Sequence, residues 1–182
     1  HTDFMNISLS ETGGVGGMAA SIVTGNGADK LTNILNLRPY IKEENLWCVG
    51  NREYDDDYEN EIRNSSATYV SLDHLRNQGV LKSVQLFLSE IENKNLDGFW
   101  LHIDVDVLND TIMPCVDSRT PDGLTYAEFN ELTSMLFQSN LLTGLEITIL
   151  DPDLDPTGQY TKEFVNHFSA TFNQHIHFFF WR

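Results

Sequence analysis

Residues 100–108 read Trp-Leu-His-Ile-Asp-Val-Asp-Val-Leu, an apolar run that ends in two carboxylates separated by one residue. In a strand, residues i and i+2 point to the same face, so Asp104 and Asp106 lie side by side, or close together where the strand opens into a loop. Two neighbouring negative charges beside a hydrophobic sheet repel each other and lose hydration, which a cation would relieve. The pattern favours a hard divalent metal, with a solvated acidic loop as the alternative.

The composition is that of one globular domain. The 182 residues are 41% hydrophobic, enough for a substantial core. The net charge of −16 argues against sequence-independent binding of nucleic acid and against adhesion to anionic membranes. Cys48 and Cys115 form no C-x-x-C pair, which is typical of reduced thiols. Because there is also no signal peptide and no apolar run of about 18 residues, we expect a cytoplasmic location.

Short apolar runs alternate with amphipathic stretches, which predicts an α/β domain with a largely parallel sheet. The expected strands are residues 46–49, 67–70, 98–103 and 144–150. One helix is predicted from an apolar stripe at helical spacing, made by Val80, Val84, Phe87, Leu88 and Ile91. A second begins near Thr125, where Glu128 completes a capping box, and a third covers about residues 160–172. The aromatic tail at 175–181 is interpreted as an edge strand or a partner-facing segment.

Three further segments accompany the acidic pair. The chain opens His1-Thr2-Asp3, a loop runs from Met113 to Thr125, and a later strand covers residues 144–152 and reads G-L-E-I-T-I-L-D-P. In this order they resemble the arginase/agmatinase/formiminoglutamase (ureohydrolase) family, whose motifs are D-A-H-x-D, then S-x-D-x-D-x-x-D-P with a T-P-x-x-G-G-L-T loop, then G-L-D-x-x-E-x-N-P. The resemblance covers His1 to about Phe168. It implies a three-layer α/β/α, arginase/deacetylase-like fold with two Mn²⁺ at the carboxyl ends of the strands.

Carried over residue by residue, the resemblance implies four metal ligands, namely His1, Asp3, Asp104 and Asp106. Hard oxygen donors suit Mn²⁺, and a water shared by two such ions becomes a nucleophile near neutral pH. In the family this water attacks a guanidinium-type carbon of a small molecule. The family also has an upstream histidine and an upstream aspartate, which precede the point where this chain starts. We therefore expect residues 1–182 to form a single but partial domain with about four of six ligands.

Departures from the family pattern concern the substrate. Ile149 stands where the family has the glutamate that grips the guanidinium, so a charge-assisted bidentate contact is lost and arginine is not the expected substrate. Gly16 falls where arginases have a histidine near the site, and Met5 replaces an asparagine that reads the amino-acid end of arginine.

Other polar residues near these motifs have more than one interpretation. His102 is interpreted as a packed core histidine that points away from Asp104. Glu146 falls at the family's Asp position, where a supporting role behind the ligands is expected. Asp117 and Arg119 lie in the loop above the expected site, and both substrate contact and surface pairing stay open.

The sequence thus predicts a Mn²⁺-dependent hydrolase of C–N bonds other than peptide bonds, acting on a small molecule, and leaves a homo-oligomer open. One alternative is an arginase-like metal-binding protein without hydrolase activity, which Ile149 favours. Another is a Mg²⁺-dependent phosphatase of the haloacid-dehalogenase type, in which Asp104 would be the nucleophile. This second alternative leaves His1-Thr2-Asp3 and the loop before Thr125 unexplained.

Overall fold

The computed structural model describes residues 1–10, 13–53 and 56–173, and the chain divides into two compact units, His1–Leu72 and Asp73–Arg182. The aromatic tail at 175–181 lies outside the described residues. No helix in the described part of the chain is long and apolar enough to cross a membrane. The single domain expected from the sequence stays a prediction.

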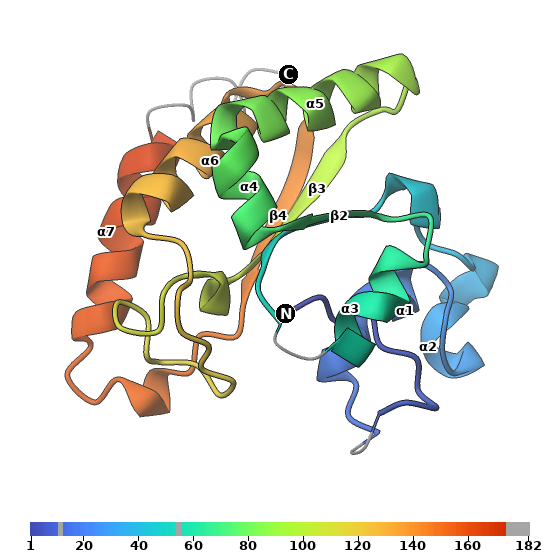
Figure 1. Ribbon diagram of the computed structural model, residues 1–182, viewed down its shortest axis with the longest axis horizontal. Coiled ribbons are helices and arrows are strands. Elements are labelled where there is room, and N and C mark those ends of the chain that lie inside the picture. Colours follow the sequence, from blue (N-terminus) through green and yellow to red (C-terminus); the bar gives the residue numbers. More distant parts are fainter. Residues whose placement is uncertain (11–12, 54–55, 174–182) are drawn as a thin grey trace. The chain divides into compact units, whose positions relative to one another are not determined.

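The first unit is built on two parallel strands, β1 (Trp47–Asn51) and β2 (Thr68–Ser71), with Trp47 opposite Thr68. Both lie within one or two residues of the expected strands. Its helices are α1 (Ala19–Val23), α2 (Asp29–Thr32) and α3 (Asp56–Arg63), with short 3-10 segments η1 (Gly16–Met18), η2 (Ile34–Asn36) and η3 (Glu43–Asn45) (Figure 1). The parallel pairing requires a crossover, which α3 supplies.

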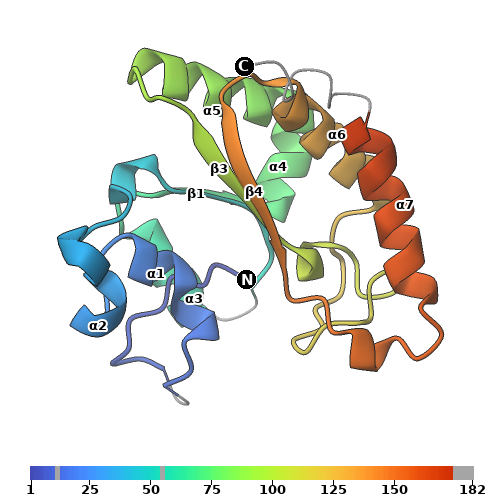
Figure 2. The same cartoon turned by 180° about the vertical axis from the view of Figure 1, so that it is seen from behind.

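The second unit is built on β3 (Phe99–Asp104) and β4 (Leu142–Thr148), which run parallel and side by side, with Asp104 opposite Thr148 (Figures 1 and 2). Its helices are α4 (Leu72–Gln78), which starts at the boundary between the units, α5 (Val80–Asn93), α6 (Tyr126–Gln138) and α7 (Gln159–Asn173). Short 3-10 segments follow the two strands, η4 (Val105–Val107) and η5 (Pro152–Leu154). The α/β class with parallel strands, predicted from the sequence, is confirmed.

The helices form where the apolar periodicity and the capping residues predict them. In α5, Val80, Val84 and Ile91 are buried, as the stripe requires. At the start of α6 the Thr125 hydroxyl accepts the Glu128 N–H at 3.2 Å, and the Glu128 carboxylate accepts the Thr125 N–H at 2.8 Å. This capping box is the predicted one, and it satisfies two N–H groups that the first helical turn leaves without partners.

One face of the β3–β4 pair carries the core of the second unit. Its buried members come from α5, β3, α6 and β4 and are Val84, Ile91, Phe99, Leu136, Phe137 and Leu142. From α7, Phe168 and Phe172 pack edge-to-face on the Phe137 ring, with ring centroids 5.6 and 5.1 Å apart. Aromatic rings in this geometry contribute about 1 kcal/mol each beyond area burial. The core therefore fixes β3, and with it the position of its last residue, Asp104.

The strand expected at 144–150 is displaced, because β4 ends at Thr148. Ile149 has a φ of 73°, in the left-handed region that β-branched residues rarely adopt. That conformation turns the chain out of the strand one residue after the position opposite Asp104. The apolar run beyond Thr148 is therefore a turn rather than strand.

Relief of this backbone strain should stabilise the protein. We expect Ile149→Gly to raise the free energy of unfolding by about 1 kcal/mol, since glycine adopts a positive φ without steric cost. Ile147→Gly is the matched control, because Ile147 is equally exposed (37%) but lies inside β4. It should lower stability instead. Urea unfolding of both variants checks the prediction, and a loss of stability in Ile149→Gly would contradict it.

Arg76 of α4 ties that helix to α6 and to the loop before it. Its Nε donates to Glu128 Oε1 at 2.7 Å, one Nη donates to Asp122 Oδ1 at 3.0 Å, and the other donates to the carbonyl of Gly123 at 3.1 Å. The bond from Arg76, opposed in part by burial and aided by the N–H of Thr125, lowers the pKa of Glu128 to about 2. The contact between Arg76 and Glu128 therefore stabilises the start of α6 fully only while Glu128 is ionised.

The Arg76 cluster predicts a pH-dependent contribution to stability. The pKa of Glu128 is lower in the folded state than its ordinary value of 4.5, so the contribution is complete above about pH 4.5 and is lost as the pH falls through about 2. We expect Arg76→Met to cost about 2 kcal/mol at pH 7 and progressively less toward pH 2. Urea unfolding across this range measures it, with Glu131→Gln, an exposed carboxylate of the same helix, as the control. A pH-independent difference would contradict the assignment.

Candidate metal centre

Asp104 and Asp106 lie where the sequence places them, at the carboxyl end of β3. Asp104 is the last residue of the strand and Asp106 is in η4. Asp106 is only 5% exposed, and its neighbour Val105 is fully buried. Burying a carboxylate costs several kcal/mol unless it is paired, hydrogen-bonded or bound to a metal. The structure therefore places a buried carboxyl group two residues after Asp104, and a divalent cation stabilises such a pair in its ionised form.

The segment after Asp106 is held by backbone hydrogen bonds to the Pro-Asp-Gly-Leu-Thr loop. The Leu124 N–H donates to the carbonyl of Val107 at 2.8 Å, and the Asn109 N–H donates to the carbonyl of Leu124 at 2.9 Å. Gly123 lies directly against this segment, because a Cβ there would come within 2.3 Å of the carbonyl carbon and oxygen of Leu108. The segment that follows the predicted ligand Asp106 is thus fixed by close contact between two backbones.

Asp104 is held by two polar side chains on the same face of the sheet. The Thr148 hydroxyl donates to Asp104 Oδ1, and His102 Nε2 lies 3.2 Å from the same oxygen. Burial opposes ionisation of Asp104, but the hydrogen bonds from His102 and Thr148 outweigh it and hold its pKa below the ordinary value. Asp104 is therefore a fixed carboxylate anion at neutral pH.

The interpretation of His102 as a core residue that points away from Asp104 is wrong. Residues 102 and 104 are two apart in a strand and so share a face, and the His102 side chain is 43% exposed. Its Nδ1 lies 2.8 Å from Glu146 Oε1 on β4. The pKa of His102 is raised to about 9, mainly by its hydrogen bond to Asp104 and to a lesser extent by its hydrogen bond to Glu146, while burial opposes this shift. Glu146 thus contacts His102, which in turn contacts Asp104. This arrangement suits the supporting role behind the ligands that we expect of Glu146.

His1, Thr2 and Asp3 lie in the first unit, where the end of β1 holds their backbone. The Asn51 side-chain amide donates to the carbonyl of His1, and a Glu53 carboxylate oxygen accepts the Thr2 N–H. The carbonyl of Asp3 accepts the N–H groups of residues 20 and 21 at 3.0 and 3.3 Å, at the start of α1. The backbone between the two predicted ligands is therefore fixed from both sides.

Sequence reasoning missed Asn51 and Glu53. Burial raises the pKa of Glu53 above its ordinary value, although the bond from the Thr2 N–H opposes this shift. The signal was present, because Gly50-Asn51-Arg52-Glu53 directly follows an apolar strand, as Asp104 and Asp106 do. Polar residues at the carboxyl ends of parallel strands are the usual place for binding residues.

The four predicted ligands are divided between the two units, His1 and Asp3 in one and Asp104 and Asp106 in the other. Within residues 1–10, 13–53 and 56–173, no three His, Cys, Asp or Glu side chains gather into a group that could hold a metal ion. The four side chains nevertheless fit Mn²⁺ in chemical type, since three are carboxylates and one is an imidazole.

The two predicted substrate contacts, Asp117 and Arg119, are both exposed. Arg119 donates a hydrogen bond to Asp110 Oδ2 at 3.1 Å, so it takes part in a surface ion pair.

Sequence comparison connects the chain with arginases. The model of the Arginase family matches residues 1–172. The arginase of Bacillus subtilis (strain 168) is 27% identical over 168 residues, which are 91% of this chain and 56% of that protein. The arginase of Staphylococcus aureus (strain COL) is 24% identical over 174 residues, 96% of this chain and 57% of that protein. The chain thus spans a little more than half the length of these relatives.

Solved structures agree with the sequence comparison. The crystal structure of arginase from Bacillus subtilis str. 168 superposes with a TM-score of 0.85 at 25% identity, over 94% of this chain and 59% of that one. The formimidoylglutamase of the same organism, at 24% identity and a TM-score of 0.71 over 94% of this chain and 50% of that one, shares the fold. The α/β, arginase-type fold expected from the sequence is confirmed, and since the family model covers nearly the whole length, the chain belongs to the arginase family.

Proposed function

We propose that the protein carrying this chain is a metal-dependent hydrolase that cleaves a C–N bond other than a peptide bond in a small molecule. The ligands of a Mn²⁺ pair would be His1, Asp3, Asp104 and Asp106. The observation that carries the proposal is the nearly fully buried Asp106 carboxylate beside Asp104, at the carboxyl end of a parallel strand, in a chain of the arginase family. Divalent ions held by these residues would supply a water of lowered pKa, which is a nucleophile for carbon at neutral pH.

The chain's own residues would orient the ligands. Thr148 and His102 keep Asp104 ionised and fix the direction of its carboxylate, and Glu146 holds His102 in place. In the first unit, Asn51 and Glu53 hold the backbone around Thr2, between the two ligands. Such supporting contacts alter metal affinity about 10- to 100-fold when they are removed.

The proposed substrate is a guanidino- or amidino-type compound other than arginine. Ile149 offers no charge to a guanidinium, and the residue is 37% exposed at this turn. Asp117 and Arg119 are the proposed substrate contacts, and Arg119 would exchange Asp110 for the substrate. A cytoplasmic location and a homo-oligomer stay predictions from the sequence.

A second candidate function is metal binding without hydrolysis, which the loss of the guanidinium-gripping glutamate at Ile149 favours. The phosphatase alternative is not retained, because the family match covers His1-Thr2-Asp3 and the loop before Thr125, which that alternative left unexplained.

A substrate screen separates hydrolysis from metal binding alone. The Mn²⁺-loaded protein is incubated with guanidino, ureido and formimino compounds, and release of urea, ammonia or formamide is measured. We expect turnover of at least one compound, abolished by a chelator and in Asp106→Asn. Turnover that persists in Asp106→Asn would contradict the proposed site. If the protein holds Mn²⁺ but hydrolyses none of these compounds, metal binding without hydrolysis would be favoured.

A further inference from the structure

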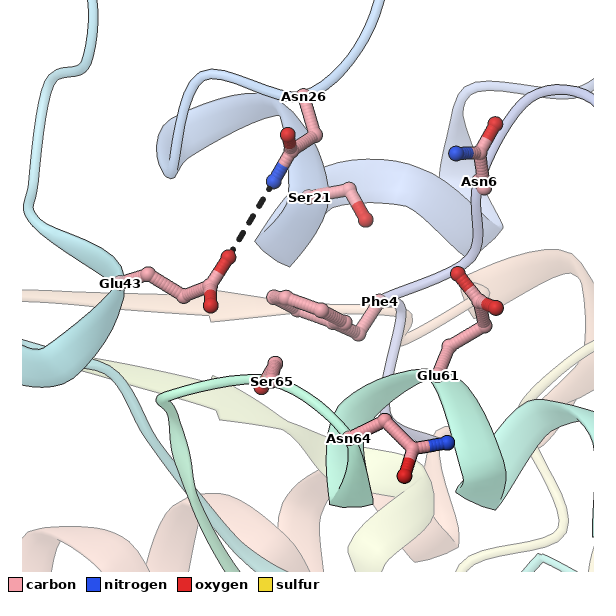
Figure 3. A pocket seen from close by; sticks show the side chains of 8 residues that line it. All are labelled: Phe4, Asn6, Ser21, Asn26, Glu43, Glu61, Asn64 and Ser65. Atoms are coloured by element: carbon pink, nitrogen blue, oxygen red, sulfur yellow. Dashed lines mark hydrogen bonds between the residues drawn. The ribbon is translucent and has the colours of Figure 1, made fainter.

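The first unit contains a pocket that the proposed metal centre does not use. Its volume is about 320 Å³, within the range of small-molecule sites. It is lined by the segment after Asp3, by α1 and the loop that follows it, by η3, and by the end of α3 (Figure 3). All of these elements belong to the first unit, so the pocket is complete within it.

The lining combines an apolar floor with carboxylates and neutral polar groups. Phe4, 6% exposed, contributes an aromatic ring, which Figure 3 shows between the carboxylates of Glu43 and Glu61. The remaining lining residues are asparagines and serines, and no lysine, arginine or histidine is among them. The pocket therefore has a negative potential and no internal cation to neutralise it.

The two carboxylates differ in how far the protein satisfies them. One oxygen of Glu43 accepts the N–H and the hydroxyl of Ser66, at 2.8 and 2.9 Å, and the other is 3.5 Å from the side-chain amide of Asn26. The Glu61 carboxylate forms no hydrogen bond or ion pair with any residue that the structure describes, although the residue is half-buried on α3. Its carboxylate remains available to a ligand.

A third group points to a ligand independently of the charges. Ser21 of α1 is 3% exposed, yet its hydroxyl forms no hydrogen bond within the described part of the chain. Figure 3 shows this hydroxyl directed into the pocket, above Phe4. A hydroxyl that opens into the pocket without a protein partner can accept a hydrogen bond from a bound donor.

The lining distinguishes an organic cation from a metal ion. A hard metal takes six or more oxygen ligands in a compact shell, and no three acidic or imidazole side chains of the described residues gather in that way. The two carboxylates instead flank an aromatic ring, across which an alkyl chain can lie, and a cation near the ring gains further attraction. A pocket with a carboxylate at each end and an aromatic surface between them is complementary to a small molecule that has a positive charge at each end and an alkyl chain between.

We propose that this pocket binds a small organic dication, two amine or guanidine groups joined by an alkyl chain. One cationic group pairs with Glu61, the other lies by Glu43 and Asn26, and the chain lies on the Phe4 ring. The Ser21 hydroxyl accepts a hydrogen bond from the ligand. The site is separate in composition from the predicted ligands His1, Asp3, Asp104 and Asp106, so binding should not require Mn²⁺.

Calorimetric titration of the chelator-treated protein tests the proposal. The probes are cadaverine (a five-carbon diamine), pentylamine, which has one charge, and pentanediol, which has none. We expect cadaverine to bind, pentylamine to bind at least about tenfold more weakly, and pentanediol not to bind. In Glu61→Gln the affinity for cadaverine should fall by at least about tenfold, as expected for a lost charge-assisted hydrogen bond. Ser21→Ala should weaken it by a smaller factor.

Glu92→Gln controls for the overall charge of −16. It removes the same charge from an exposed position on α5, in the second unit, and should leave the affinity unchanged. Circular dichroism confirms that each variant is folded. The proposal is overturned if the chelator-treated protein does not bind cadaverine, if pentanediol binds equally well, or if Glu61→Gln and Glu92→Gln weaken binding to the same extent.

Discussion

Asp106→Asn is expected to lower the Mn²⁺ affinity of the protein that carries this chain by more than about 100-fold. As a metal ligand, the buried Asp106 carboxylate would supply both a negative charge and an oxygen donor, whereas the asparagine amide keeps the shape and loses the charge. Equilibrium dialysis followed by elemental analysis measures the bound metal, with about two Mn²⁺ per chain expected for the unmodified protein.

Asp97→Asn is the matched control for this substitution. Asp97 is exposed and precedes the opposite, amino-terminal end of the same strand, β3. It should leave metal binding unchanged. Equal Mn²⁺ content in Asp106→Asn and the unmodified protein would rule out Asp106 as a ligand.

Gly123→Ala is expected to destabilise the second unit by about 3 kcal/mol. An alanine Cβ would lie 2.3 Å from the backbone carbonyl atoms of Leu108 and 2.4 Å from the backbone nitrogen of Asn109. Backbone atoms cannot rotate away as the end of a side chain can, so the two segments must separate and their hydrogen bonds through Leu124 must break. Because that contact fixes the segment after Asp106, Mn²⁺ affinity should fall together with stability.

Gly16→Ala is the control for Gly123→Ala. A Cβ at Gly16 meets no atom within 4 Å, so this substitution should have little effect on either property. Urea unfolding and metal titration of both variants provide the measurements. A Gly123→Ala protein as stable as the unmodified one would show that the contact between the two backbones is not needed.

Local sequence signals predicted the elements that depend on local physics. The capping box of Thr125 and Glu128 placed the start of α6, and the apolar stripe of α5 placed its buried face. Asp104 and Asp106 were correctly placed at a strand end, since an apolar run followed by carboxylates implies a sheet edge. These features need only the spacing of a few neighbouring residues.

The sequence did not reveal features that depend on backbone conformation or on contacts between distant segments. The positive φ of Ile149 ends β4 early, although the run Ile-Thr-Ile-Leu is a good strand sequence. The hydrogen bond from the Asn51 side chain to the carbonyl of His1 joins residues 50 positions apart. The pocket around Phe4 is lined by polar residues from four separate segments. His102 was misplaced for a simpler reason, since strand alternation itself puts it beside Asp104.

The central claim is that Asp104 and Asp106 bind a catalytic metal pair together with His1 and Asp3. Diffraction from crystals of the Mn²⁺-loaded protein, recorded at the manganese absorption edge, tests it most directly. We expect anomalous peaks in contact with the carboxylates of Asp104 and Asp106 and with the His1 and Asp3 side chains. Manganese bound elsewhere, or none at these carboxylates in crystals of protein shown to hold the metal, would contradict it.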